Sequence, residues 1–295
     1  MDDKLAALFE DQDGVATSEQ ILTLVSRRYL ETVLECTAVE RIWRGVYSLG
    51  VADTSRRLKG LDLAGGEVVA ICLATAAGAY VFDTQSSAEL HVLNPSGHQL
   101  RPVEGLVVHR RDGAPLITVS GRPATAPAWT AIEVARTLRR PRALATLDAA
   151  LRSGRCDPAD LTRAVLAQQG RRGIVKVRQL LPLADARAES PMESEARLVM
   201  LDGGLPSPVL QHEVIDACGR LRRLDFAWPD YRVAAEYDSD EWHVGAEALR
   251  RDRRKLAALQ DLGWVVVPIV ADDVRRQPTA LVDRIRGHLD RAAVA

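Results

Sequence analysis

The stretch LDFAWPDYRVAAEYDSDEWH, residues 224–243, holds two short apolar runs with acids at fixed places, and it decides the fold. Each run has the length and composition of a β-strand, and the PDYR segment between them is typical of a tight connection. If the hairpin centres between Asp230 and Tyr231, Asp225 lies directly opposite Glu236, with Cβ atoms about 5 Å apart. Asp-Tyr is not a preferred two-residue turn, but a four-residue loop with the same centre gives the same pairing.

Three acids are then expected on one face of this hairpin. Side chains alternate between the two faces of a strand, so Glu236 and Asp238 point to the same side, and Asp225 joins them from the neighbouring strand. Carboxylates crowded together repel each other unless a proton, an arginine or another cation lies between them. The sequence therefore predicts a site that supplies one of these three.

The stretch SPMESEARLVMLDGG, residues 190–204, has helix signals at both ends. Ser190 is a cap, Glu193 completes a capping box with it, and the Gly-Gly pair ends the helix. Glu195 falls among the apolar positions Met192, Leu198 and Val199 and faces inward, where a carboxylate needs a partner. We expect this helix to pack against the acidic face of the hairpin.

The segments around the hairpin complete an α/β domain. A strand is expected at VLQHEVIDA, residues 209–217, and a second one at WVVVPIV, residues 264–270, where Pro268 indicates an edge or an irregularity. Between the hairpin and the last strand, residues 245–264 predict a helix, and a final helix follows. The order helix–strand–strand–strand–helix–strand–helix predicts a mixed sheet. The leucines expected to face inward are Leu249, Leu256, Leu259 and Leu262 in the first helix and Leu281 and Leu289, with Ile285, in the last.

This succession resembles the Vsr-like branch of the PD-(D/E)XK nuclease superfamily over nearly all of residues 189–295. The resemblance implies a restriction-endonuclease-like α/β domain that hydrolyses DNA phosphodiester bonds with Mg²⁺, or with Mn²⁺ in its place. It implies that Asp225 and Glu236 hold the metal, that Glu195 assists, and that Gln211 is an auxiliary residue. Mg²⁺ takes oxygen ligands and uses one or two carboxylates together with substrate phosphate, which suits these acids.

The sequence departs from the superfamily pattern at the residue that follows the second acid by two positions. Asp238 stands where the superfamily has lysine, and Ser239 stands where related domains without that lysine have glycine. In those domains a histidine acts as base or as a water-mediated ligand, and His243 fits by position. The alternative is a histidine that packs beside Trp242.

An arginine-rich run occupies the helix that follows. Asp252 is either an auxiliary acid or the ion-pair partner of a neighbouring arginine. Arg250 and Arg254 either belong to a solvated helix face or bind the DNA backbone, which would make the affinity salt-dependent.

The first 50 residues predict a separate small unit of three helices and a β-hairpin. Helices are expected over residues 2–10, from residue 17 with Thr17 or Ser18 as cap, and from residue 27 with Ser26 as cap and Tyr29, Leu30, Val33 and Leu34 buried. RIWRGVYSLG then predicts a hairpin that turns at Gly45. This order, with its RGVYSL ending, resembles the N-terminal winged helix-turn-helix domain of AbiEi-type antitoxins from abortive-infection systems. The resemblance implies contacts with double-stranded DNA; the alternative is a protein-interaction domain. The residues placed for phosphate or base contacts are Arg27, Arg28, Arg41 and Arg44.

Residues 51–188 form a middle α/β region whose order of elements also resembles AbiEi-like proteins. Helices are expected at residues 66–78, 86–93, 142–154 and 158–170, the last opened by Asp157 and Pro158, and strands at residues 104–110 and 115–121. His91, His98 and His109 share no metal-ligand spacing, so we expect core or surface histidines here.

Composition sets the remaining bounds. No apolar run approaches the ~20 residues of a membrane span, the acidic start lacks a secretory signal, and the four cysteines form no CxxC pair, which together favour the cytoplasm. A net charge of −1 gives no global case for nucleic acid. Two functions remain open for the predicted domains 1–50, 51–188 and 189–295: a DNA endonuclease, with RNA as another substrate, or an AbiEi-like regulator and antitoxin with a cognate toxin and an inactive nuclease fold.

Overall fold

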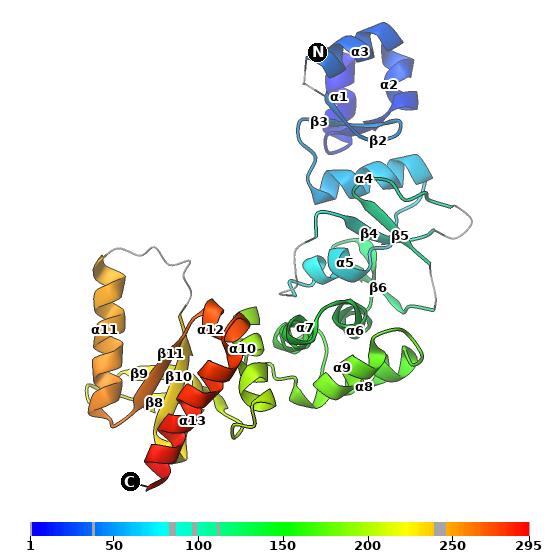
Figure 1. The fold of residues 1–295 in the computed structure, drawn as a ribbon. Coiled ribbons are helices and arrows are strands. Elements are labelled where there is room, and N and C mark those ends of the chain that lie inside the picture. The colour runs from blue at the N-terminus through cyan, green and yellow to red at the C-terminus, as the bar shows by residue number, and fades with distance from the viewer. Residues whose placement is uncertain are drawn as a thin grey trace. The chain divides into compact units, whose positions relative to one another are not determined.

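The computed structural model describes residues 2–36, 39–82, 87–95, 99–110, 113–238 and 246–294, without the side chains of residues 246, 248, 249, 251 and 252. Over these residues the chain is an α/β protein with several small sheets and one mixed four-stranded sheet (Figure 1). It divides into two compact units. The first comprises residues 1–79 and 86–126, and the second comprises residues 80–85 and 127–295.

Three helices and a three-stranded antiparallel sheet make up the start of the first unit. The helices begin at the side-chain caps Asp2, Thr17 and Ser26, so Thr17 rather than Ser18 is the second cap. The sheet has the order β1-β3-β2, and its β2–β3 hairpin turns at Gly45 with a φ of 73°, as predicted. The elements are α1 (Asp3–Asp11), β1 (Val15–Thr17), α2 (Ser18–Leu24), α3 (Arg27–Glu35), β2 (Val39–Trp43) and β3 (Val46–Leu49). Strand β1 was not predicted, because three residues are too few to show an alternation.

The apolar stripes of these helices meet in one core. In α3 the side chains of Leu30 and Val33 are buried, and Tyr29 and Leu34 pack at the margin of the same cluster, as the spacing predicts. Burial of this stripe stabilises a helix of nine residues, which is too short to be stable alone.

A fourth helix, α4 (Thr54–Gly65), packs on this sheet. The indole Nε1 of Trp43 donates a hydrogen bond of 2.8 Å to the carbonyl oxygen of Arg57. Gly60 lies against the strands, where an added Cβ would come within 2.8 Å of Val46 Cγ1. A side chain at position 60 would therefore push the helix off the sheet.

The rest of the first unit holds two small sheets, and two predictions fail there. Residues 86–93 were expected to be a helix, but they end in strand β4, where Leu90 and Val92 are buried and which pairs in parallel with β5. Residues 66–78 were expected to be one helix, but Ile71 bridges to two strand residues and the helix begins only at Leu73. In both cases alternate apolar side chains find partners on other segments, which periodicity in a single segment does not reveal. The elements are α5 (Leu73–Ala79), β4 (Leu90–Leu93), β5 (Leu106–His109), β6 (Leu116–Val119) and β7 (Arg122–Thr125).

Four helices open the second unit after residue 126. Helix α7 is the most buried of these, with an unbroken buried run from Ala143 to Ala150. Helix α8 begins at Asp157 with a capping box and has Pro158 in its first turn, as predicted. The elements are α6 (Pro127–Thr137), α7 (Arg140–Arg152), α8 (Pro158–Ala167), α9 (Ile174–Leu180) and the 3-10 turn η1 (Leu181–Leu183).

A four-stranded sheet with the order β11-β10-β9-β8 follows in the same unit. Its neighbouring strands are antiparallel except β10 and β11, so the predicted mixed sheet is confirmed, and β11 with Pro268 is an edge strand. The elements are α10 (Pro191–Asp202), β8 (Val209–Ile215), β9 (Leu221–Trp228), η2 (Pro229–Tyr231), β10 (Val233–Tyr237), α11 (Ala246–Asp261), β11 (Val265–Ile269), α12 (Ala271–Arg275) and α13 (Pro278–Val294).

The sheet is covered on both faces. One face packs Phe226 and Ala235 with residues of α10 and α13, including Ala196, Leu281, Ile285 and Leu289. The other face packs Ala227 and Ala234 with Leu259 of α11. Leu256 was expected to face inward in α11, but its side chain is 41% exposed, because the helix presents mainly Leu259 to the sheet.

Candidate functional site

The register of the β9–β10 hairpin continues to Asp225 and Glu236 as the next facing positions. The strands pair with Trp228 opposite Val233 and Phe226 opposite Ala235, and four residues connect them. The next pair in this register is Asp225 and Glu236, so the centre predicted from the sequence is correct. Asp225 Oδ2 accepts a hydrogen bond of 3.0 Å from the backbone amide of Tyr237, which fixes its carboxylate at the end of the hairpin.

A lysine of α11 neutralises the second acid. Lys255 Nζ lies 2.6 Å from Glu236 Oε1, and both side chains are partly buried. In the sequence Lys255 is one of several basic residues in the arginine-rich run and was not predicted as a site residue. Its position four residues before the buried Leu259 was the signal, because residues four apart share one face of a helix.

A third carboxylate reaches this region from the first turn of α10. Glu193 is 8% exposed, and its Oε2 accepts hydrogen bonds of 2.9 Å from the amide of Glu189 and of 2.9 Å from Nε2 of Gln211. The predicted capping box is therefore incomplete: Ser190 caps the helix, but the Glu193 carboxylate turns to the amide of Glu189 and to β8 instead of to the Ser190 amide.

Burial makes both Glu193 and Asp225 reluctant to ionise. Desolvation raises the pKa of Glu193, and the negative charge of Asp225 raises it further, although the hydrogen bond from the Glu189 amide opposes the shift. Desolvation also raises the pKa of Asp225, against the hydrogen bond from the Tyr237 amide and the charge of Lys255. Acids with raised pKa values that lie together are candidates for a functional site.

Gln211 adds a strained backbone to the same place. Its φ of 52° is unusual for a residue with a side chain, and the residue lies between the paired residues Leu210 and His212 of β8, next to β9. Its Nε2 donates to Glu193, whereas its Oε1 is buried and has no hydrogen-bond partner among the described residues. A buried acceptor of this kind calls for a donor such as a protonated carboxyl group or a water molecule.

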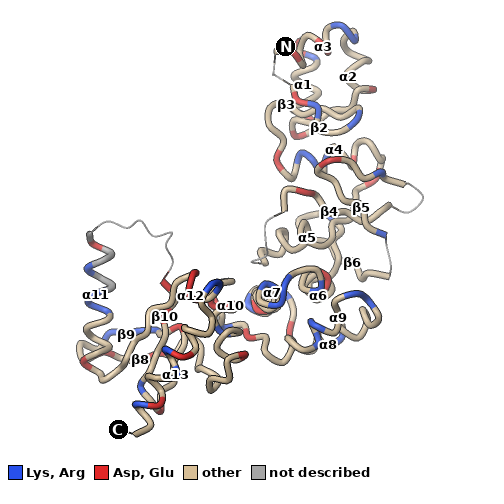
Figure 2. Tube along the Cα trace, viewed as in Figure 1, with Lys and Arg blue, Asp and Glu red and all other residues tan. Residues whose placement is uncertain are grey.

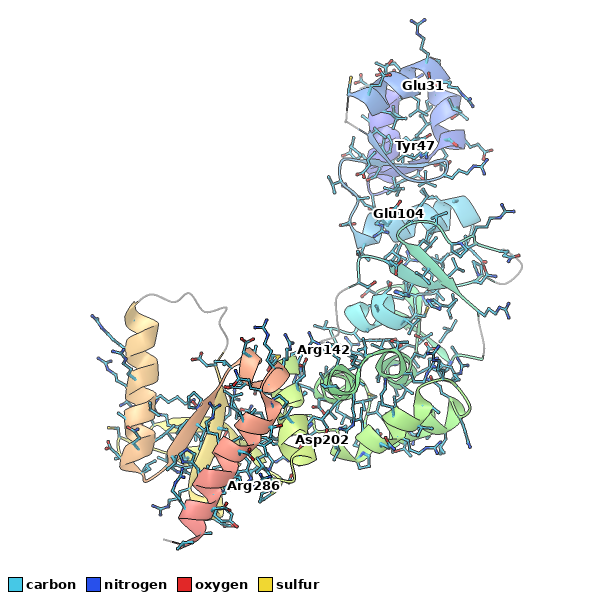
Figure 3. All side chains as sticks on the ribbon, in the orientation of Figure 1. Glu31, Tyr47, Glu104, Arg142, Asp202 and Arg286 are labelled. Atoms are coloured by element: carbon cyan, nitrogen blue, oxygen red, sulfur yellow. The ribbon has the colours of Figure 1, made fainter. Side chains whose placement is uncertain are left out.

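Glu195, the predicted catalytic acid of α10, has other partners. Its side chain is clamped between Arg142 of α7, at 3.2 Å, and Arg275 of α12, at 3.2 Å (Arg142 is labelled in Figure 3). The residue is buried and needs a partner, as expected, but arginines supply it. Its described contacts are to these two guanidinium groups and do not include Asp225 or Glu236, so its predicted role as an assisting acid stays a prediction.

The other predicted site residues are dispersed or not described. Asp238 is exposed, and its amide donates to the carbonyl oxygen of Ile269. Arg250 and Arg254 are exposed on α11. His243, with Ser239 and Trp242, lies outside the described residues, as does the side chain of Asp252.

The described acids do not fit the metal ion that the resemblance implies. Among the residues that the structure describes, no three His, Cys, Asp or Glu side chains are arranged to hold one. Glu236 is paired with Lys255, Glu193 with an amide and Gln211, and Glu195 with two arginines. Each of these carboxylates therefore already has an ion-pair or hydrogen-bond partner in the protein.

The predicted DNA-binding arginines of the N-terminal region are all exposed. Arg27 and Arg28 lie in the first turn of α3, and Arg41 and Arg44 lie on β2 and at its turn. Within the described part of the chain, no hydrogen bond or ion pair engages these four guanidinium groups. The surrounding sequence is acidic, since residues 1–53 carry ten Asp and Glu against five Lys and Arg.

Positive charge is concentrated in the helices α6–α9 instead. Residues 127–188 hold twelve Lys and Arg and five Asp and Glu, a net charge of +7 in a chain of net −1, and Figure 2 shows the basic residues along α7, α8 and α9. Arg139, Arg155, Arg172 and Arg178 are exposed there without a described acidic partner. The net charge of the whole chain conceals this asymmetry, because the acids of the other segments cancel the basic residues of this one.

Two comparisons with known proteins bear on this arrangement. Residues 69–183 match the family model of the AbiEi antitoxin C-terminal domain. The chain is also 56% identical over 272 residues to an uncharacterized protein of Mycobacterium tuberculosis strain CDC 1551 / Oshkosh, and equally to one of strain H37Rv. These alignments cover 92% of this chain and all of each relative. No helix in the described ranges has the length and apolar character needed to cross a membrane.

Proposed function

The chain belongs to one protein family with the two mycobacterial proteins, and we propose that it is a DNA-binding regulator and antitoxin of the AbiEi type. The observation that carries the proposal is the match of residues 69–183 to the AbiEi antitoxin C-terminal domain. An antitoxin of this type implies a cognate toxin as partner. The nuclease-like C-terminal domain then serves without catalysis.

Residues 2–49 act in this proposal as a winged helix-turn-helix. Three helices, an antiparallel sheet and a hairpin with Gly45 at its turn are the parts of such a domain. Helix α3 would enter the major groove, which is wide enough for one helix, and the β2–β3 hairpin would be the wing. The exposed guanidinium groups at both places support phosphate contacts, because no acid of the described chain occupies them.

The distribution of charge along the chain predicts how strongly each region binds DNA. A region with twice as many acids as bases repels DNA except where its arginines meet phosphates, so the N-terminal region alone should bind weakly at physiological salt. The +7 segment of α6–α9 supports a larger contribution from the AbiEi-matched helices to the attraction of a polyanion.

The test joins regulation to antitoxin activity. The full chain should repress a reporter placed behind its own promoter, and it should restore growth of cells that express the toxin encoded beside it, for which a nucleotidyltransferase-type enzyme is expected. Arg28→Ala with Arg44→Ala should lose repression. Failure of both repression and rescue by the wild-type chain would reject the proposal.

A metal-dependent DNA endonuclease is the second candidate, because the buried Glu193 and the half-buried Asp225 both have raised pKa values. For a metal ion to bind at Glu236, Lys255 would first have to release that carboxylate. Plasmid and single-stranded DNA would be incubated with the chain and Mg²⁺ or Mn²⁺, and Glu236→Ala and His243→Ala would be compared. Metal-dependent nicking that disappears in Glu236→Ala would establish this activity. Nicking that persists in His243→Ala would discard His243 as the base.

A further inference from the structure

The acidic end of the β9–β10 hairpin needs a positive charge, and the described residues provide one from α11. We infer that Lys255 is a built-in cation that holds Glu236 and Asp225 together, in place of the metal ion that the resemblance implies. The inference concerns the C-terminal domain alone and does not require that the chain binds DNA.

The first support is contact geometry. Lys255 Nζ lies 2.6 Å from Glu236 Oε1, with the two side chains 30% and 23% exposed. The charge of Lys255 also acts on Asp225, whose pKa it lowers against the larger effect of burial. The ammonium group therefore contacts Glu236 and lies close enough for its charge to act on Asp225.

The second support is the way that α11 delivers the lysine. Leu259, one turn further along the helix, is wholly buried against Leu224, Ala227 and Ala234 of the sheet. This anchor fixes the face of α11 that points to β10, so the position of Lys255 follows from packing. Arg253 and Arg254, on either side of that face, are exposed.

The third support is that a lysine and a hard divalent cation exclude one another here. Mg²⁺ needs near-octahedral oxygen ligands at about 2.0–2.1 Å. A lysine ammonium donates hydrogen bonds only and repels a second cation at the same carboxylate. Because the ammonium group already contacts Glu236, a metal ion could bind this carboxylate only after Lys255 had moved away from it and the ion pair between α11 and β10 had broken.

The experiment measures the thermal unfolding of the full chain in chelator and in millimolar MgCl₂ or MnCl₂. Lys255→Met should lower Tm by about 2–4 °C, since it leaves the carboxylates of Glu236 and Asp225 without the nearby positive charge. Adding Glu236→Gln to Lys255→Met should restore most of that loss. Lys255→Arg should keep the wild-type Tm, and Mg²⁺ or Mn²⁺ should not change the Tm of the wild-type chain.

Arg253→Met is the matched control, because it removes one charge from the same helix without a described partner. The inference would be overturned if Lys255→Met had the same Tm as Arg253→Met and wild type. It would also be overturned if Lys255→Met lowered Tm and adding Glu236→Gln did not restore it. A wild-type Tm that rises when Mg²⁺ or Mn²⁺ is added would overturn it as well. None of these readouts uses DNA or toxin, so they stand whether or not the regulator proposal holds.

Discussion

Asp148 of α7 and Arg197 of α10 form an ion pair that is closed off from solvent. Arg197 Nη2 lies 2.6 Å from Asp148 Oδ2, and the side chains are 7% and 0% exposed respectively. Asp148 Oδ1 also accepts a hydrogen bond of 2.8 Å from the amide of Asp185, and Arg197 Nη1 donates one of 2.5 Å to the carbonyl oxygen of Leu183. The pair therefore ties α7 to α10 and to the segment between them.

Breaking this pair from one side should be costly. Arg197→Met leaves the Asp148 carboxylate buried without its counter-charge, so we expect the free energy of unfolding to fall by about 3–5 kcal/mol in denaturant titrations. Asp148→Asn combined with Arg197→Met should cost less than Arg197→Met alone, because no charge then stays buried.

The control for this prediction is the more exposed pair of Arg187 and Asp185, whose side chains are 58% and 22% exposed respectively. Arg187→Met should change the free energy of unfolding by roughly 0–1 kcal/mol. Equal losses for Arg187→Met and Arg197→Met would show that burial does not set the cost.

The observed contacts of Glu195 and Glu193 show which parts of the site can be predicted from a sequence. Helical spacing correctly buries Glu195, because that depends on α10 alone. Its partner Arg142 lies more than fifty residues upstream, and only tertiary packing brings it near. Glu193 fits a local capping pattern, whereas its contact with Gln211 of β8 arises only from tertiary packing and could not be predicted. Strand pairing was predictable because the hairpin is local.

The same rule explains the errors of the middle region. Leu90 and Val92 read equally well as a helix start or a strand, and β5, their partner, lies beyond an undescribed segment of the chain. Short apolar runs in separate segments form strands only when they pair with each other. Periodicity in one segment cannot distinguish the two outcomes.

Two aspartates of the C-terminal sheet should respond to pH with opposite signs. Burial raises the pKa of Asp225, so its charged form destabilises the fold above that raised pKa, and the penalty vanishes as the pH falls below the unfolded value of about 3.9. Asp225→Asn should therefore raise Tm near neutral pH, and the gain should shrink as the pH falls.

Asp216, in the β8–β9 turn, has a pKa that is shifted in the opposite direction, below its usual value. The amide of Arg220 is the first of the donors that lower its pKa, followed by Arg222 and the amide of Cys218. Its stabilising effect is present above the unfolded pKa and is lost as the pH falls through the lowered one. Asp216→Asn should lower Tm near neutral pH, with a difference that disappears in acid. Parallel pH profiles for the two variants would contradict the assignment.

His91 and His109 form a pair that the sequence did not suggest. Their strands lie in parallel, His91 Nδ1 is 2.9 Å from His109 Nε2, and their ring centroids are 5.2 Å apart. Burial lowers the pKa of both rings, the charge of His91 lowers that of His109 further, and Glu89 opposes the shift at His91.

Since the folded state binds protons at these rings less tightly than the unfolded state, stability should fall as the pH drops below about 6.5. In His109→Gln, the loss of Tm between about pH 7.5 and the folded pKa should be smaller than in wild type. Thermal unfolding over this pH range checks the prediction. A variant that is as acid-sensitive as wild type would exclude the pair as the cause.

The final prediction concerns the exposed arginines of the N-terminal region. If Arg27, Arg28, Arg41 and Arg44 each meet one phosphate, the contribution of this region to the slope of log K against log salt is about −3 to −4. Each change to alanine should weaken binding uniformly across DNA sequences and reduce the magnitude of the slope by about 1. Fluorescence anisotropy of the full chain with a labelled duplex at several salt concentrations measures both quantities.

Glu31→Ala is the control of opposite sign, because Glu31 is exposed on α3 one turn after Arg27 and Arg28, and its carboxylate repels phosphates. It should tighten binding at low salt. If Glu31→Ala weakens binding, or if the four alanine variants keep the wild-type slope, α3 and the hairpin do not face the DNA backbone, and the region belongs to the protein-interaction class.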